Sequence, residues 1–308
     1  MITFPRTLDE AANAVGEKRA GGVDIQDRYR SGVSAGPLVD IRLLTELELL
    51  AWGEDGSLRI GALVRLAKLL NDWQFTQTYP GLTEAIANIA TPQIRAMGTV
   101  GGNLLQSPRC TYYRHPEISC YRKGGIGCPA RLGNYLHGIC FDSQFCIAPH
   151  PSTLSMALLA YDASIQFHGE PLHSLSDTTF LSHNKSSPLL VQVSLPPPRK
   201  REQAVYRRVT SRAFADWPFV EVLIRLEVQE HIEFARVTVG GVAPTPLRLH
   251  HVEALLIGQS ATTDVLENAA AAAGTQAKPL PSTAYKVHLM QECILDTLIS
   301  LQDLLQMA

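Results

Sequence analysis

The chain has 308 residues, of which 45% are hydrophobic and 18% charged, and its formal net charge is −2. This composition is typical of a globular protein with about two domains of ~150 residues each. A near-neutral charge gives no reason to expect nucleic acid or an anionic membrane as a partner. No apolar run approaches the ~20 residues needed to span a bilayer.

The N-terminal segment, MITFPRTLDEAANAV, lacks the basic stretch followed by an apolar stretch that marks a signal peptide. The sequence therefore favours the cytoplasm. Export as a passenger on a partner subunit stays open.

Regular patterns in the first two thirds of the chain predict short helices and strands around a long irregular stretch. Helices are expected at 8–15, starting from Thr7, at 65–73 and at 152–161. Strands are expected at 38–41, 58–62, 164–167 and 189–195, and Pro196 to Pro198 end the last of them. Residues 107–146 are polar, rich in cysteine and almost without periodicity, which in a compact domain usually means function or disorder.

The last third predicts a small antiparallel sheet that carries helices. Residues 219–228 partly alternate between apolar and polar, and 232–242 can pair with them through the polar turn at 229–231. Helical patterns follow at 249–257, 263–273 and 283–305. The expected fold class is therefore α+β, with a domain boundary just after Pro198.

Two glycine pairs stand out, Gly21-Gly22 and Gly101-Gly102, each with an acidic or amide residue close behind it, Asp24 and Asn103. Glycines lack Cβ atoms, so their loops let backbone N–H groups approach a bulky anion. One such turn is weak evidence because most glycine pairs are ordinary turns. Two of them in one domain suggest a diphosphate held between two loops.

Five of the six cysteines fall in the irregular stretch: Cys110, Cys120, Cys128, Cys140 and Cys146. Disulfides are disfavoured in the cytosol, and free cysteines usually lie in apolar cores. Thiolates gathered in a polar loop suggest a metal. Zinc is one option, although its structural sites usually show paired C-x₂₋₄-C spacing, which is missing here. An iron–sulfur cluster, which accepts wider spacing, is the other.

These segments resemble the FAD-binding subunits of molybdenum hydroxylases, the xanthine dehydrogenase family. The resemblance rests on five segments in the expected order: AGGVD at 20–24, LRIGA at 58–62, TPQIRAMGTVGGN at 91–103, CIAPHPS at 146–152 and GGVAPTP at 240–246. It covers essentially the whole chain. It implies a two-part FAD-binding domain of the PCMH type at 1–198, followed by the family's C-terminal domain at 199–308.

The resemblance implies that FAD is the cofactor and that its pyrophosphate lies between the two glycine loops. The residues carried over as cofactor-binding are Ala20, Gly21, Gly22, Val23, Asp24, Ile25, Thr99, Gly101, Gly102, Asn103, Thr153 and Arg208. Two of them depart from the family pattern: Val23 stands where the family has Thr, and Thr153 stands where it has Asp. Arg208 stands where the family has Lys, and a cation there can stabilise a reduced, anionic flavin. Asp24 as a loop cap and Arg208 as an exposed strand residue are the alternatives.

Two branches of the family, 4-hydroxybenzoyl-CoA reductase and the periplasmic aldehyde oxidoreductases, carry an additional [4Fe–4S] cluster in this place. The resemblance to their ligand segments assigns Cys110, Cys120, Cys128 and Cys146 as cluster ligands. Cys140 is the spare and could displace Cys146. Cys293, on the last expected helix, is interpreted as a packed thiol.

The function implied is that of an oxidoreductase component, the FAD-binding subunit of a heterotrimeric molybdenum hydroxylase. Its partners would be a large molybdopterin subunit, a small [2Fe–2S] subunit and an external electron acceptor. No catalytic residue is assigned, because no Ser-His-Asp or Cys-His pair is convincingly placed for nucleophilic catalysis, and the substrate would bind on another polypeptide. Two alternatives remain: a stand-alone FAD-dependent oxidase or reductase with the same fold, and a metal-binding scaffold that has lost flavin.

Overall fold

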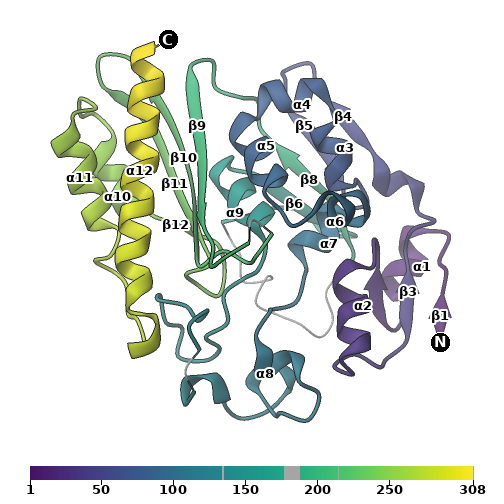
Figure 1. The fold of residues 1–308 in the computed structure, drawn as a ribbon. Helices are drawn as coiled ribbons and strands as arrows, with labels where there is room; N and C mark the ends of the chain where they lie inside the picture. Colours follow the sequence, from purple (N-terminus) through teal and green to yellow (C-terminus); the bar gives the residue numbers. More distant parts are fainter. Residues whose placement is uncertain (134, 177–187, 214, 308) are drawn as a thin grey trace.

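The structure is a computed structural model, and it describes residues 1–133, 135–176, 188–213 and 215–307. Within these residues the chain forms three sheets with helices packed around them (Figure 1). The mixture confirms the predicted α+β class. Among the described helices, none combines the length and the apolar character needed to cross a membrane.

The N-terminal sheet has three parallel strands in the order β1 (Ile2–Thr3), β3 (Leu38–Asp40) and β2 (Glu17–Arg19). The predicted first helix is confirmed as α1 (Leu8–Asn13), and it begins where the Thr7 hydroxyl accepts a hydrogen bond from the Glu10 amide. Helix α2 (Val23–Arg30) follows the first glycine pair and was not predicted. Its N-cap, Gly22, has a φ of 79°, which favours glycine because a Cβ is strained there.

The second sheet has five antiparallel strands in the order β4-β5-β8-β6-β7. They span β4 (Leu50–Trp52), β5 (Leu58–Gly61), β6 (Ser164–Phe167), β7 (Leu172–Ser174) and β8 (Leu190–Leu195). The helices beside it are η1 (Thr45–Glu48), α3 (Leu66–Leu70), α4 (Trp73–Thr78), α5 (Pro80–Ala87), α6 (Pro92–Met97), α7 (Val100–Leu104) and α9 (Thr153–Ala160). The predicted helix at 65–73 is wrong at its end, because Asp72 accepts a hydrogen bond from the Phe75 amide and starts α4 instead.

The third sheet confirms the predicted hairpin and its helices. Its strands are β9 (Glu202–Val209), β10 (Val220–Val228), β11 (Ile232–Gly240) and β12 (Leu247–Arg248), paired antiparallel in the order β12-β11-β10-β9. The helices are α10 (His250–Leu256), α11 (Thr263–Ala272), the 3₁₀ turn η5 (Pro281–Thr283) and α12 (Tyr285–Met307).

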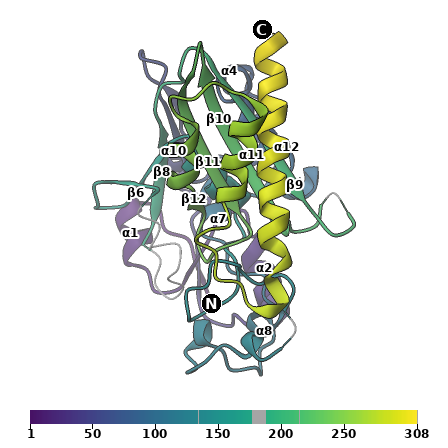
Figure 2. The same cartoon turned by 90° about the vertical axis from the view of Figure 1, so that its left-hand side faces the viewer.

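The two faces of the third sheet contact different parts of the molecule. Val222 and Ile224 of β10 belong to the core that includes Leu298 of α12, whereas Leu223 belongs to the core shared with the second sheet. Figure 2 shows α12 running along one face of this sheet. Helix α9, in which every residue is buried, packs against the other face. This helix therefore joins the two large parts of the chain.

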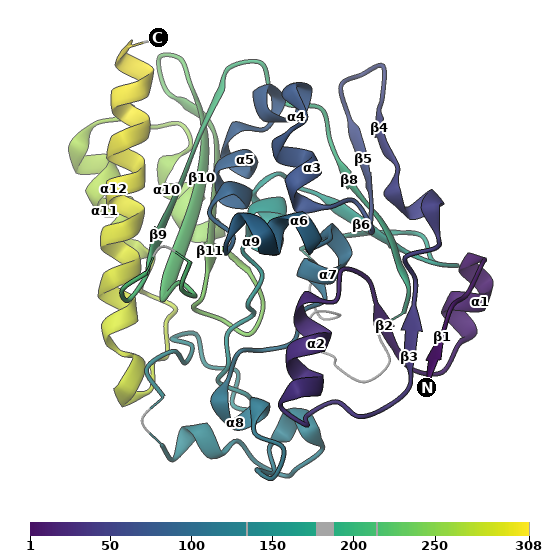
Figure 3. The same cartoon turned by 45° about the vertical axis from the view of Figure 1, so that its right-hand side comes forward.

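The cysteine-rich segment has little regular structure, as predicted. It contains only α8 (Thr111–Arg114) and two 3₁₀ turns, η2 (Tyr121–Lys123) and η3 (Pro129–Arg131), within its described residues. It lies at one end of the molecule, beneath both α2 and the third sheet (Figures 1 and 3). It has a small apolar core of its own that includes Tyr113, Tyr135 and Ile147.

Candidate functional site

A cavity of about 900 Å³ lies between the N-terminal sheet, the second sheet and the connection between β9 and β10. Ten of the twelve predicted cofactor residues line it: Ala20, Gly21, Gly22, Val23, Asp24, Ile25, Thr99, Gly101, Gly102 and Asn103. The structure thus brings both glycine loops, some eighty positions apart in the sequence, to one hollow large enough for a dinucleotide.

The two loops touch each other directly. A Cβ atom placed on Gly21 would overlap the carbonyl oxygen of Met97, which lies just before the second loop. Glycine at position 21 is therefore required by close backbone packing, and glycine at position 22 by its left-handed conformation.

Free backbone donors come from the first loop. Gln26 is the first residue of α2 whose amide bonds back to the loop, to the carbonyl of Gly22. Among the described residues, nothing accepts a hydrogen bond from the amides of residues 21–25. A helix start leaves such donors unpaired and partly positive, which suits an anion.

The second loop is not the predicted turn but the short helix α7. Its N-cap, Thr99, is buried, and the Thr99 hydroxyl accepts a hydrogen bond from the Gly102 amide at 3.1 Å. The amides of Val100 and Gly101 donate to the carbonyls of Val64 and Ala62, both at 2.9 Å. Its first amides therefore already have protein acceptors. Asn103, whose side chain accepts a hydrogen bond from Ser152 at 2.7 Å, is a second polar residue of this loop, besides Thr99, that lines the cavity.

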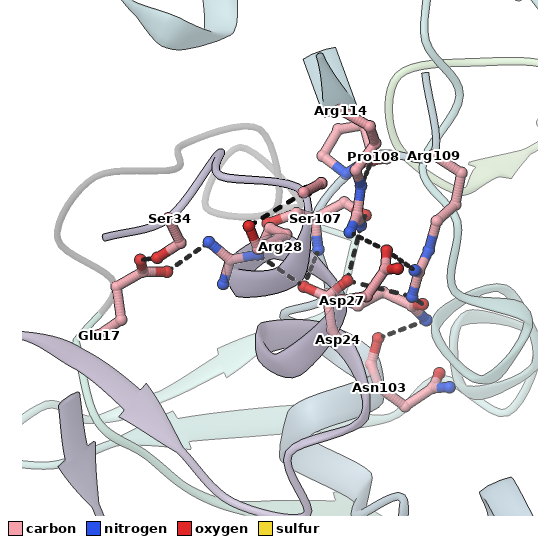
Figure 4. Close-up of polar contacts among 12 residues, drawn as sticks. Glu17, Asp24, Asp27, Arg28, Ser34, Asn103, Ser107, Pro108, Arg109 and Arg114 are labelled. Atoms are coloured by element: carbon pink, nitrogen blue, oxygen red, sulfur yellow. Dashed lines mark hydrogen bonds and ion pairs between the residues drawn. The ribbon is translucent and has the colours of Figure 1, made fainter. Parts of the chain in front are cut away.

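Asp24 links the first loop to the cysteine-rich segment (Figure 4). Its carboxylate accepts hydrogen bonds from Arg28, from the Ser107 amide at 3.1 Å and from Arg114 at 2.6 Å, and Arg109 lies 3.1 Å away. Burial opposes ionisation of Asp24, but the charges of these arginines outweigh it and hold the pKa of its carboxyl below the usual value. Asp24 is thus more than a loop cap.

Thr153 and Arg208 do not line the cavity. Thr153 is buried on α9 and hydrogen-bonds the carboxyl group of Glu221, which also accepts a hydrogen bond from Tyr206 at 2.9 Å. Arg208 donates to the carbonyl oxygens of Asn88 and Asp216. A cofactor contact by either residue stays a prediction.

The four cysteines assigned as cluster ligands gather at one small core, while the spare lies elsewhere. Cys110 and Cys120 are buried in the small core of the cysteine-rich segment, and the partly buried Cys128 and Cys146 pack against it. Cys140 belongs instead to the core of the third sheet, where its amide donates to the carbonyl of Val242. Cys293 is buried in that same core, as expected for a packed thiol.

Hydrogen-bond donors surround the grouped sulfurs. The amides of Tyr112 and Tyr113 point at Cys110, and those of Ala130 and Ile147 at Cys128. The Cys128 thiol donates a hydrogen bond to the sulfur of Cys146, and this bond lowers the pKa of Cys146 to about 5 against the effect of burial. Arg122 Nε lies 3.2 Å from the same sulfur. Such donors stabilise thiolates. Among the described residues, however, no three cysteine, histidine or acidic side chains meet at the spacing of a single metal ion.

Sequence reasoning missed two prominent cavity residues. Arg109 stands next to Cys110, and its guanidinium lies 4.7 Å from the ring centre of Trp217, on the connection between β9 and β10. Burial lowers the pKa of Arg109, as do the neighbouring charges of Arg114 and Arg28, while Asp24 and Asp27 raise it. No local pattern indicates this pair, because the fold alone brings positions 109 and 217 together.

Comparison with known proteins agrees with this architecture. Residues 2–198 match the FAD binding domain in molybdopterin dehydrogenase, and residues 204–301 match the CO dehydrogenase flavoprotein C-terminal domain. The chain is 30% identical to the aldehyde oxidoreductase FAD-binding subunit PaoB of Escherichia coli K12, over 86% of this chain and 89% of that protein. It is 28% identical to subunit alpha of the 6-hydroxypseudooxynicotine dehydrogenase complex of Paenarthrobacter nicotinovorans, over 79% of this chain and 72% of that one.

Solved structures show the same fold at low identity. The carbon monoxide dehydrogenase of Hydrogenophaga pseudoflava contains a chain that superimposes with a TM-score of 0.75 at 19% identity, covering 98% of this chain and 96% of that one. Quinoline 2-oxidoreductase of Pseudomonas putida 86 gives 0.74 at 17% identity, with 97% and 95% covered. With two matched domains spanning almost its whole length, the chain belongs to the FAD-binding subunits of the molybdenum hydroxylase family, and is an oxidoreductase component.

Proposed function

We propose that this chain is the electron-transfer subunit of a heterotrimeric molybdenum hydroxylase. In the proposed complex a large molybdopterin subunit oxidises the substrate, and a small [2Fe–2S] subunit passes the electrons to FAD on this chain. From FAD the electrons are transferred to an external acceptor. The relative from Paenarthrobacter nicotinovorans is itself named as a subunit of a dehydrogenase complex. We place the complex in the cytoplasm, where all six cysteines, free in the structure, stay reduced.

The single observation that carries the FAD site is the row of amides at residues 21–25 that have no acceptor among the described residues, in a loop that lines a cavity of about 900 Å³. These donors suit a diphosphate. The second loop forms part of the cavity wall and contributes the side-chain amide of Asn103. Bound flavin supplies the redox chemistry, exchanging electron pairs and single electrons. The chain's own part is to hold it, exclude water and set its surroundings. We assign residues 1–198 to the FAD-binding domain and 199–308 to the C-terminal domain.

We propose that Cys110, Cys120, Cys128 and Cys146 hold a [4Fe–4S] cluster. Four thiols gathered in or against one small core, with amides and Arg122 directed at the sulfurs, support this set over one that contains Cys140. A four-iron cluster is larger than a single ion, so its sulfurs stand further apart. Hydrogen bonds to the sulfurs are one of the means by which proteins tune such clusters.

Anaerobically purified full-length protein tests both assignments. We expect flavin absorption, together with about four iron and four sulfide per chain. Flavin without iron would favour a stand-alone oxidase or reductase, and zinc or iron without flavin a scaffold. Co-purification of two further subunits, one with molybdenum, would support the complex.

A pair of cysteine variants tests the ligand set. Cys120→Ser should lose most of the iron, whereas Cys140→Ser should keep it, because Cys140 lies in a different core. A Cys120→Ser protein with its full iron content would overturn the assignment.

A further inference from the structure

Arg109 and Trp217 both line the cavity, and they come from segments that are far apart in the sequence. Arg109 opens the cysteine-rich segment, immediately before Cys110, while Trp217 lies on the connection between β9 and β10. The guanidinium carbon stands 4.7 Å from the centre of the indole ring. A planar cation stacked on an indole offers a flat, electron-poor surface to a ligand.

Three groups hold the Arg109 side chain in place. Its Nη2 lies 3.1 Å from Asp24 and donates to Gln106 at 3.1 Å, and its Nη1 lies 3.7 Å from Asp27. Its Nε is buried, and nothing among the described residues accepts a hydrogen bond from it. A buried donor without an acceptor is unfavourable.

The shape of the cavity decides which part of the cofactor meets this pair. Figures 1 and 3 both show α2 and α7, which carry the glycine loops, between α1 and the lower ends of β9 and β10. The lining extends from Ala12 on α1 to Trp217. A dinucleotide whose diphosphate lies at the loops therefore directs one ring system toward α1 and the other toward Arg109. We assign the redox-active ring to the second end, because Arg109 directly precedes Cys110, one of the grouped thiols.

We propose that Arg109, stacked on Trp217, is the cation that contacts the flavin ring and stabilises its reduced form. The proposal rests on the proposed function, because it requires FAD in this cavity. Uptake of two electrons, delivered by the [2Fe–2S] partner, and of one proton from water converts the neutral oxidised ring into a monoanion. A fixed positive charge stabilises that anion more than the neutral ring, so it raises the flavin potential.

Arg208, the cation expected at the flavin from the sequence, is placed differently. Its two terminal nitrogens donate to backbone carbonyls, of Asn88 and Asp216, and it is not among the residues that line the cavity. We therefore expect Arg109 rather than Arg208 to set the potential.

The test compares flavin potentials and FAD affinities of wild-type protein and variants, purified anaerobically. Arg109→Met should weaken binding of reduced FAD at least tenfold more than binding of oxidised FAD, which lowers a two-electron potential by about 30 mV. Arg109→Lys keeps the charge and should recover about half of that loss. Arg131→Met is the matched control in the same segment, because Arg131 pairs with Asp142 and does not line the cavity. It should leave the potential unchanged.

The outcomes separate this proposal from the proposed function. Wild-type protein that binds no FAD would refute the FAD site itself. Wild-type protein that binds FAD, with an Arg109→Met variant whose relative affinity for the two forms changes less than twofold, would overturn only the role of Arg109. If Arg109→Met retains no flavin, Trp217→Leu replaces it: loss of the stacking partner should lower the potential, and an unchanged potential would overturn the proposal.

Discussion

The two glycine loops share a sequence pattern but differ in structure. The loop at 20–25 passes through a left-handed Gly22 and starts α2, with five amides that have no acceptor among the described residues. The loop at 99–103 is already a helix, and its first amides are bonded to Thr99, Ala62 and Val64. The first loop is therefore built to donate to a ligand, whereas the second is built to be rigid.

This difference shows that a glycine pair has two separate uses. At Gly21 and Gly22 the missing Cβ allows a close approach and an unusual backbone angle, so that donors remain exposed. At Gly101 it allows α7 to pack against Ala62, where a Cβ would come within 3.0 Å of the alanine Cβ. The comparison predicts that substitutions in the first loop affect ligand binding most.

The largest effect is expected for Gly21→Ala. Its Cβ would overlap the Met97 carbonyl and push the two loops apart. Overpacking of this kind costs about 3 kcal/mol, or roughly 100-fold in the dissociation constant for FAD. Gly36→Ala is the matched control, because Gly36 also lines the cavity but has open space where its Cβ would lie. Titration of apoprotein with FAD measures both, and equal affinities would contradict the close-packing argument.

Asp24→Asn should have the next largest effect, on stability. The change removes the charge that holds Arg28, Arg109 and Arg114. Breaking a fully buried pair costs about 3–5 kcal/mol, and because these side chains are partly exposed we expect about 2–3 kcal/mol. Asp27→Asn should cost less than about 1 kcal/mol, because the Asp27 side chain is 59% exposed. Urea unfolding of the two variants at neutral pH gives the comparison. A result in which Asp27→Asn is the more harmful would show that the ion cluster is not centred on Asp24.

His150 supports the second loop and should make stability depend on pH. It donates to the Leu104 carbonyl at the end of α7, and burial lowers its pKa from 6.5 to about 3. The unfolded chain takes up a proton below pH 6.5 and the folded chain does not, so this contribution is lost as the pH falls. Between pH 6.5 and 5 the loss amounts to about 2 kcal/mol.

The measurement for His150 is the unfolding free energy at pH 7 and pH 5. Wild-type protein should lose about 2 kcal/mol more than His150→Gln over this interval. His288→Gln, a substitution at a side chain that is 79% exposed, should behave as wild type. Equal losses in wild type and His150→Gln would mean that His150 gains a proton in the folded state.

Local chemistry made much of the fold predictable. Thr7 and Ser152 cap α1 and α9 where the sequence placed the helix starts, and the polar turn at 229–231 joins β10 to β11. In each case a few neighbouring residues determine the outcome. Helix α2 was missed because its start follows a glycine pair, which local rules interpret as a turn, and its residues are mostly polar.

The site was predictable only where its residues follow one another in sequence. The two loops could be identified by pattern, and so could the group of cysteines. The choice between Cys140 and Cys146 as the fourth ligand could not be made from a local pattern, because it depends on which core each side chain reaches in the fold. The approach of Trp217 to Arg109 depends likewise on long-range packing, which no local pattern encodes.

The smallest effect is expected for Thr99→Ala in the second loop. The change leaves the Gly102 amide without its cap acceptor, at a cost of about 1 kcal/mol in stability, and Thr99→Ser should restore most of it. FAD affinity should fall only a few-fold, because Val100 and Gly101 keep their backbone bonds to Val64 and Ala62. A loss as large as that of Gly21→Ala would show that the Thr99 hydroxyl itself contacts the cofactor, and the contrast between a donating loop and a rigid one would then be wrong.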